Sequence, residues 1–182
     1  MGIYISLLRG INVSGKNKIL MADLKIVYES LSFKNVTTYI QSGNVIFESP
    51  SAKKLEEVIS NKIKEAYGFE VPVLVKNMEE FLEAVSSNPF LKEKNIELDK
   101  LHLTFLSSTP ATTTIDKIKD IKTEDRYSIV GPNVYLYCPI GYGNTKLNNT
   151  LLEKKLEVKA TTRNWKTCNE IIHIVNTKYL NK

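Results

Sequence analysis

Cysteine and histidine are scarce in this chain, with two of each among 182 residues. Cys138 and Cys168 stand among apolar neighbours, and no second cysteine or histidine follows at the spacing of a zinc site, so we interpret both as buried hydrophobic side chains. His102 falls within an expected strand and His173 on the polar side of an expected helix. We therefore predict no metal site, no cofactor and no identifiable catalytic residue, and leave open whether the protein is an enzyme.

Long apolar runs are missing as well. No stretch approaches the roughly 18 consecutive apolar residues that a membrane span requires. The N-terminus also lacks the basic start and the apolar segment of a secretory signal. The composition, with 42% hydrophobic and 25% charged residues, is typical of ordinary globular proteins. From these absences we expect a cytoplasmic protein with no membrane partner, and we leave its oligomeric state open.

Positive charge is concentrated in the second half of the chain. Residues 1–90 contain 10 Lys+Arg and 10 Asp+Glu, whereas residues 91–182 contain 15 and 10. The formal net charge of +5 therefore arises entirely from the second half. A basic surface attracts phosphates, nucleic acid or an acidic membrane without selecting among them. The alternative is a set of solvated lysines with no partner.

The periodicity of apolar residues predicts the same order of strands and helices in both halves of the chain. The first half has the pattern strand, helix, strand, strand, helix, strand. Its second helix has Ser49 and Pro50 as an expected N-terminus, and a linker helix follows with capping-box spacing at Asn77 and Glu80. The second half shows strand, helix, strand, strand and helix, and a terminal helix is expected to begin near Thr162.

This order predicts an α+β fold. We expect two tandem ferredoxin-like (βαββα) subdomains with mixed or antiparallel sheets and a C-terminal helix, related as a duplication of element order. The predicted domains are 1–88, a βαββαβ subdomain with its linker helix, and 100–182, a βαββα subdomain with its terminal helix. The polar segment between them, with its alternating charges, is the expected boundary.

The loop after the first strand is the most informative motif. Its sequence, RGINVSGKNK over residues 9–18, has two glycines and three cations. The spacing of Gly10, Gly15 and Lys16 matches the G-x-x-x-x-G-K of phosphate-binding loops, but Asn17 occupies the position of the Mg²⁺-binding Ser or Thr. The expected helix also begins several residues too late for such a loop. The motif therefore favours an anion site and disfavours a nucleoside triphosphatase.

Two further segments offer polar groups to the same anion. A tight hairpin carries Gln41, Ser42 and Asn44, for which simple turn chemistry is the alternative explanation. Arg163 and Asn164 stand at the expected start of the last helix, where free N–H groups favour an anion, and a helix cap is the alternative. The predicted ligand-binding residues are Arg9, Gly10, Asn12, Gly15, Lys16, Gln41, Ser42, Asn44, Arg163 and Asn164.

Three segments carry a family resemblance. The runs YISLLRGINVSGKNKILMADL, TYIQSGNVIFES and ATTRNWKT resemble the signature segments of the bacterial family called domain of unknown function 1697. The resemblance implies a small bacterial α+β protein with two related subdomains, and it brings no established activity, ligand or catalytic residue. Members usually have Gly-Gly before the lysine, whereas this chain has Ser14 and Gly15, and Ser tolerates positive φ angles less well.

The residues leave three functional interpretations. The first is a small anionic ligand, a phosphate ester or carboxylate, held by the predicted set. The second is contact with a nucleic-acid backbone, with little base recognition because the sheet lacks an aromatic platform. The phosphate contacts would come from Arg9, Lys16, Lys18, Arg163 and Lys166. The third is an interaction module without a ligand, in which the motif residues hold the two halves together. Whether Arg9 and Arg163 are functional or structural, and whether the halves share one site, stays open.

Overall fold

The computed structural model describes residues 1–180, which divide into two units. The first unit contains Met1–Leu82 together with residues 171–180, and the second contains Glu83–Glu170. The divisions fall inside two helices, α3 (Met78–Ser86) and α6 (Trp165–Val175). Each unit therefore includes the end of a helix that begins in the other unit, whereas the sequence pattern placed α3 wholly in the first half and α6 wholly in the second.

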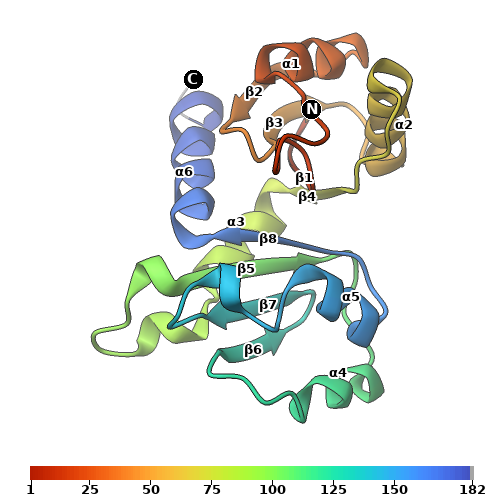
Figure 1. Ribbon diagram of the computed structural model, residues 1–182. Helices are drawn as coiled ribbons and strands as arrows, with labels where there is room; N and C mark the ends of the chain where they lie inside the picture. The colour runs from red at the N-terminus through yellow and green to blue at the C-terminus, as the bar shows by residue number, and fades with distance from the viewer. Residues whose placement is uncertain (181–182) are drawn as a thin grey trace. The chain divides into compact units, whose positions relative to one another are not determined.

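The first unit is a four-stranded antiparallel sheet with helices on both faces (Figure 1). Its strand order is β2-β3-β1-β4, and every neighbouring pair runs antiparallel. In chain order the elements are β1 (Gly2–Leu8), α1 (Met21–Ser30), β2 (Lys34–Tyr39), β3 (Asn44–Ser49), α2 (Leu55–Tyr67), β4 (Val73–Asn77), the start of α3, the end of α6 and a π-helix, η4 (Asn176–Leu180).

The second unit contains a sheet of the same kind, with the order β6-β7-β5-β8 and antiparallel neighbours. The α+β class is thus confirmed. After the end of α3 its elements are the 3₁₀ turns η1 (Pro89–Lys92) and η2 (Leu98–Lys100), then β5 (Leu101–Leu106), α4 (Thr112–Lys119), β6 (Arg126–Val130), β7 (Asn133–Tyr137), η3 (Tyr142–Asn144), α5 (Asn149–Leu156), β8 (Ala160–Asn164) and the start of α6.

Strand β8 was missed in the sequence. The expectation of a helix from Thr162 is wrong, because Ala160–Asn164 pairs with β5 and α6 begins only at Trp165. The five residues are polar or small, so they show no apolar alternation, and the strong helical stripe that starts at Trp165 obscured the boundary. The second round therefore ends in a strand, as the first does.

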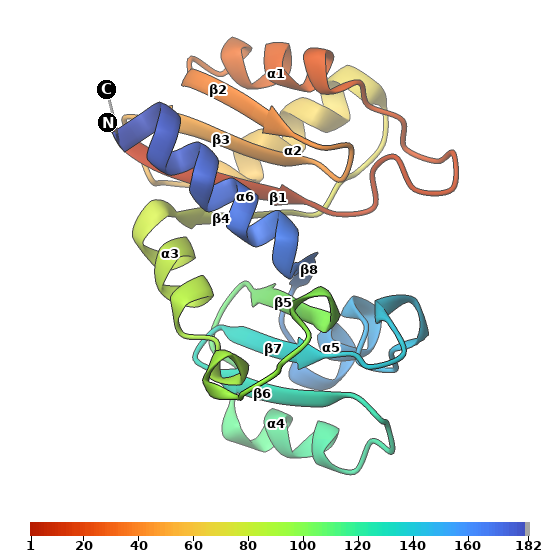
Figure 2. The same ribbon diagram turned by 90° about the vertical axis from the view of Figure 1, so that its left-hand side faces the viewer.

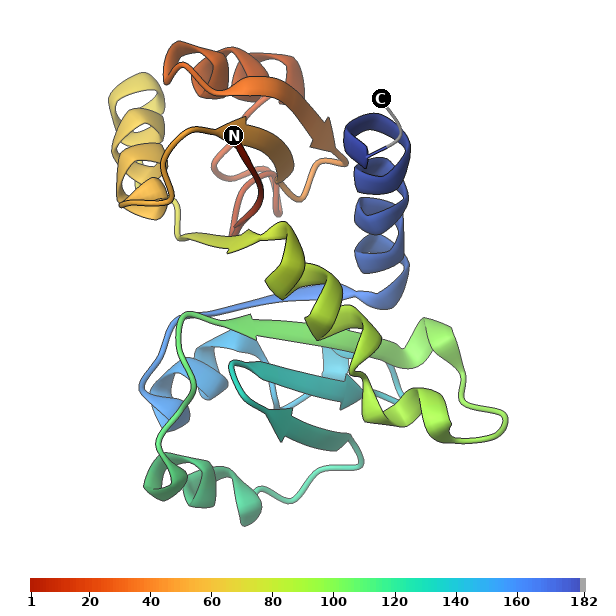
Figure 3. The same ribbon diagram turned by 180° about the vertical axis from the view of Figure 1, so that it is seen from behind.

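Both faces of the first sheet are buried. Helices α1 and α2 cover one face and the end of α6 covers the other (Figure 3). Leu8 and Phe47 belong to the cluster beneath α1 and α2, whereas Ile5 and Ile46 are fully buried on the opposite face. On that face the Tyr179 hydroxyl can donate to the carbonyl oxygen of Ile46, 2.9 Å away. This double coverage explains why β1 is almost continuously apolar.

The helix ends predicted from local sequence signals are confirmed for α3 and wrong for α2. The capping box of α3 is confirmed, because the Glu80 amide donates to Asn77 Oδ1 (2.8 Å) and the Asn77 amide donates to Glu80 Oε2 (3.0 Å). The expected start of α2 near Pro50 is wrong, since that helix begins at Leu55, and the Ser49 hydroxyl instead donates to the Ser51 carbonyl oxygen at 2.8 Å.

Among residues 1–180, no helix combines the length and apolar character of a membrane span.

Candidate functional site

The loop between β1 and α1 forms a small hairpin at the end of the first unit. Val13 and Lys16 form a β-bridge, and the Lys16 amide donates to the Val13 carbonyl oxygen at 2.9 Å. The two residues between them, Ser14 and Gly15, have φ angles of +50° and +75°. Positive φ at both central positions defines the turn that matches the twist of a β-hairpin. The loop projects beyond the ends of the strands, as Figure 2 shows.

This geometry differs from a phosphate-wrapping loop. The Lys16 amide is used inside the turn, and α1 begins at Met21 rather than at the lysine. In a true loop of that type the backbone N–H groups and the helix start converge on one phosphate. The structure therefore agrees with the sequence argument against a nucleoside triphosphatase.

Asn12 holds the loop to its surroundings. Its side-chain Nδ2 donates to the carbonyl oxygens of Ile19 (2.9 Å) and Gln41 (2.9 Å), and its Oδ1 accepts from the Ile19 amide (2.9 Å). Nδ2 also lies 3.3 Å from Gln41 Oε1. One side chain thus joins the start of the loop, the end of the loop and the β2–β3 turn. We call residues 12, 19 and 41 the Asn12 hub.

The β2–β3 turn is fixed against the same loop. Gly43 has φ of +78°, and a Cβ atom there would lie 2.6 Å from Ile11 Cδ1, so only glycine fits. Asn44 Nδ2 donates to the Tyr39 carbonyl oxygen (2.9 Å) and to Ser42 Oγ (3.1 Å). These bonds are the turn chemistry named as the alternative for this segment. The structure therefore brings the predicted turn residues beside the loop and assigns Asn44 a role within the turn itself.

Unusual backbone angles concentrate in these two segments. Among residues 1–180, nine non-glycine residues have positive φ, and four of them are Asn12, Ser14, Asn17 and Ile40. Ile40, at +48°, is the most unfavourable because its side chain is β-branched. Such strain typically accompanies functional sites. Ser14 adopts a positive φ of +50° although serine tolerates it less well than glycine, and no sequence signal indicated the strain at Ile40.

The charged residues of the loop and of the turn all have one sign. Residues 9–20 and 39–44 include Arg9, Lys16 and Lys18 and no acidic residue. Lys16 and Lys18 are exposed, and neither forms an ion pair with any described residue. The half-buried Arg9 lies at the base of the loop, where its backbone amide donates to the Pro72 carbonyl oxygen at 3.0 Å. The loop and turn thus combine cations with a rigid backbone.

Comparison with known proteins places this chain in a family. A family model described as "Protein of unknown function (DUF1697)" matches residues 1–135. The chain belongs to this family. A solved structure, the conserved bacterial protein SP0830 from Streptococcus pneumoniae, matches with a TM-score of 0.73 and 24% identity over 97% of this chain and 99% of that chain. At this identity the likeness concerns the fold. No curated protein matches.

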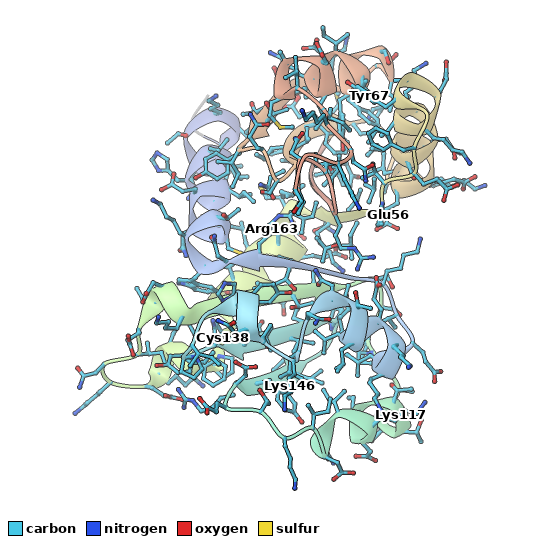
Figure 4. The ribbon with its side chains drawn as sticks, in the orientation of Figure 1. Glu56, Tyr67, Lys117, Cys138, Lys146 and Arg163 are labelled. Carbon is cyan, nitrogen blue, oxygen red and sulfur yellow. The ribbon has the colours of Figure 1, made fainter. Side chains whose placement is uncertain are left out.

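In this DUF1697 protein the two predicted ligand-binding residues of the second unit, Arg163 and Asn164, form hydrogen bonds with the protein backbone. Arg163 lies inside β8 opposite Leu103, is 8% exposed, and donates to the Thr162 carbonyl oxygen at 3.0 Å (Figure 4). Burial lowers the pKa of Arg163 to about 10, so the guanidinium stays protonated at neutral pH. Asn164 Oδ1 accepts from the Thr167 amide at 2.7 Å, which caps α6.

Three hollows within the units lie away from the predicted ligand-binding residues. One of 460 Å³ is lined by residues that include Tyr4, Glu56 and Glu80, and another of 360 Å³ by residues that include Asp125 and Lys146. A third, of 320 Å³, lies beside Met1 and Met78 and is again lined partly by Tyr4. None of the three is lined by a predicted ligand-binding residue. These three hollows therefore adjoin neither the loop of residues 9–20 nor the turn of residues 39–44.

The cysteines of this DUF1697 protein are buried, as the sequence predicted. Cys138 and Cys168 are both fully covered, and burial raises the pKa of each thiol to about 12. Thiolates are the reactive and metal-binding form of cysteine, so both side chains are held in the inert form at neutral pH. Among residues 1–180, no group of three or more His, Cys, Asp or Glu side chains is arranged to hold a metal ion.

Proposed function

We propose that the end of the first unit formed by residues 9–20 and 39–44 binds the anionic group, phosphate or carboxylate, of a small ligand. The observation that carries this proposal is the Asn12 hub, which joins the β2–β3 turn to a loop that carries three cations, and neither segment contains an acidic residue. A site that is already ordered loses little conformational entropy when the ligand binds. A hydrogen-bonded loop and turn that carry cations and no acidic residue of their own are favourable for anions.

The proposed contacts follow from side-chain chemistry. Arg9 can present two parallel donors to a phosphate or carboxylate, whereas Lys16 supplies a point charge. Gln41 and Ser42, on the adjoining turn, can add neutral hydrogen bonds. We confine the site to the first unit, since Asn164 caps a helix and Arg163 lies within a buried strand of the second unit.

We propose further that both units are ferredoxin-like and arose by duplication. Support comes from the matching orders β2-β3-β1-β4 and β6-β7-β5-β8, in which the first strand of each round lies between the third and the fourth. Each round also has the element order βαββαβ once β8 is included. In this proposal the loop of residues 9–20 is a feature of the first repeat, where β1 leads into α1.

Nucleic-acid backbone binding is the second candidate, and the projecting shape of the loop favours it. A convex surface can contact successive phosphates without enclosing any one of them. Base stacking on the sheet is disfavoured, because Phe47 lies under α1 and α2 and the other face is covered near Tyr179. Binding of this kind would depend strongly on salt and weakly on sequence.

Thermal unfolding in the presence of candidate ligands tests the proposal, since a ligand that binds only the native state raises the melting temperature. The panel contains inorganic phosphate, pyrophosphate, sugar phosphates, dicarboxylates and short RNA and DNA strands, each at low and high salt. We expect a small anion to stabilise the protein at both salt levels. Stabilisation by oligonucleotides alone, and only at low salt, would favour the second candidate.

A charge-matched pair of variants locates the effect. Lys16→Ala combined with Lys18→Ala removes two cations from the loop, and Lys34→Ala combined with Lys53→Ala removes two exposed cations elsewhere in the same unit. We expect only the first pair to reduce ligand-induced stabilisation. Equal losses in both pairs would show that net charge alone is responsible, and no stabilisation by any compound would favour an interaction module without a ligand.

A further inference from the structure

Three apolar side chains stand exposed around the Asn12 hub. Val13 is 59% exposed, Leu20 is 67% exposed and Ile40 is 44% exposed. Each is the chain neighbour of a hub residue: Val13 follows Asn12, Leu20 follows Ile19, and Ile40 precedes Gln41. Because the hub residues are hydrogen-bonded to one another, each of the three apolar residues lies one position along the chain from the same hub, at this end of the unit.

Cations lie among these side chains. Val13 is paired across the hairpin with Lys16, and Lys18 and Leu20 stand two residues apart in the same loop. Single exposed apolar residues are common on proteins, but a group of them within a basic surface indicates an interaction site. The strained φ of Ile40 is further support, since the strain occurs at a partly exposed position outside the core residues.

We propose that this end of the first unit docks on the surface of a membrane that contains anionic phospholipids. The inference rests on the proposed function, because the lipid phosphate is the anion that the exposed Lys16 and Lys18 would contact. Peripheral proteins bind such surfaces with basic residues at the headgroups and apolar side chains in the interface. A bilayer also yields to a projecting loop, whereas a folded partner would need a groove of matching shape.

This proposal reverses our expectation from the sequence, and the reversal has a physical reason. We expected no membrane partner because the chain has no long apolar run, and that criterion detects only segments that span a bilayer. The three apolar residues are separated by up to 27 positions in the chain. Only folding brings them together, through the hydrogen bonds of Asn12.

Co-sedimentation with vesicles tests the inference. Vesicles of equal parts phosphatidylglycerol and phosphatidylcholine are compared with vesicles of phosphatidylcholine alone, using the full chain. We expect binding to the anionic vesicles only, weakened by salt. Each surface lysine contributes roughly a fivefold factor in affinity, so Lys16→Ala combined with Lys18→Ala should weaken binding about 25-fold. The pair Lys34→Ala and Lys53→Ala is the charge-matched control.

A second pair of variants tests the contribution of the apolar side chains to vesicle binding. Val13→Ser combined with Leu20→Ser should weaken vesicle binding roughly tenfold, because both side chains lose their transfer into the interface. Ile26→Ser combined with Ile140→Ser, which alters two equally exposed aliphatic residues elsewhere, should leave binding unchanged. Melting temperatures of all four variants confirm that each is folded.

The possible results separate the two proposals. Stabilisation by soluble phosphates without vesicle binding would overturn the membrane inference and leave the proposed function standing. Vesicle binding that is unaffected by Val13→Ser and Leu20→Ser would also overturn it, because the contact would then be purely electrostatic. Absence of both phosphate stabilisation and vesicle binding would reject both proposals. Both proposals would be supported if vesicle binding is lost in the Lys16/Lys18 and Val13/Leu20 variants and retained in the two control variants.

Discussion

The side chain of Asn12 forms two hydrogen bonds with the backbone of Ile19, one donated to the carbonyl oxygen and one accepted from the amide, each 2.9 Å long. This pattern reproduces the exchange of bonds between opposed residues of antiparallel strands. The Asn12 side chain thus provides the pair of hydrogen bonds that a residue of an opposing strand would otherwise provide, and this holds the two ends of the loop together. The third bond, to the Gln41 carbonyl oxygen, extends the closure to the neighbouring turn.

Replacement of Asn12 should therefore loosen the whole site. We expect Asn12→Asp, which keeps the acceptor but removes both donated bonds, to lower the free energy of unfolding by about 1–3 kcal/mol. Urea unfolding measures this change. Asn17→Gly, which removes the bond to the Gly10 carbonyl oxygen and tolerates the positive φ of residue 17, should have a smaller effect. Equal effects of the two variants would show that Asn12 is not the organising residue.

Ile40 should respond in the opposite direction. Asn adopts positive φ far more readily than a β-branched residue, so Ile40→Asn should raise the free energy of unfolding by about 1 kcal/mol. The same variant should bind anionic vesicles less tightly, because an exposed apolar side chain is lost. Val13→Asn, at a position without positive φ, provides the control and should give no gain in stability. A loss of stability in Ile40→Asn would show that the side chain is structural.

Tyr179 should anchor the chain end to the first sheet. Its hydroxyl lies within hydrogen-bond distance of the carbonyl oxygens of Asn35 and Ile46 and of Thr37 Oγ1. Tyr179→Phe removes these bonds and should lower the free energy of unfolding by about 1–2 kcal/mol. Tyr39→Phe is the matched control, since that hydroxyl bonds no described residue. Similar effects of both substitutions would argue against the anchoring role.

Stability should fall in alkaline solution. Burial raises the pKa of Cys138 from 9.0 to about 12, and it raises those of Cys168 and Tyr135 to about 12 as well. Above pH 9 the unfolded chain loses thiol protons that the folded chain keeps, so deprotonation favours unfolding. The stabilising contribution is complete below pH 9 and disappears as the pH rises toward 12.

Urea unfolding between pH 8 and pH 11 measures this loss. A variant with Cys138→Ala and Cys168→Ala should lose less stability over the first part of that range, because tyrosines titrate at higher pH. Neither thiol should react with a thiol reagent at pH 8 until the protein unfolds. Rapid labelling of the native protein would contradict the burial of both side chains.

Local chemistry explains which features could be predicted from the sequence. The α3 capping box and the Gly43 turn depend on residues close together in the chain, so their spacing indicated them. Strand β8 could not be recognised, because its residues are polar and its pairing partner β5 lies almost 60 residues earlier. The start of α2 was misjudged because Ser49 and Pro50 suit a helix end or a turn equally well.

The candidate site was predicted in composition but not in arrangement. Glycines and lysines led to the prediction of an anion-binding loop, and the hairpin residues were predicted to serve the same ligand. The structure brings that turn beside the loop, whereas anion binding stays a prediction. The role of Asn12 depends on the positions of Ile19 and Gln41, which no local pattern reveals. The exposure of Leu20 and Ile40 was equally hidden, since exposed and buried aliphatic residues look alike in a sequence.

The most direct measurement is an NMR titration of the full chain with pyrophosphate, followed at assigned amide signals. If the loop binds anions, the amides of Gly10 and Gly15 and the side-chain amides of Asn12 and Gln41 should shift together and saturate with a single dissociation constant. The Lys16→Ala and Lys18→Ala variant should weaken that constant. Shifts confined to the second unit, or titration of the variant identical to that of the unaltered protein, would contradict an anion site at this loop.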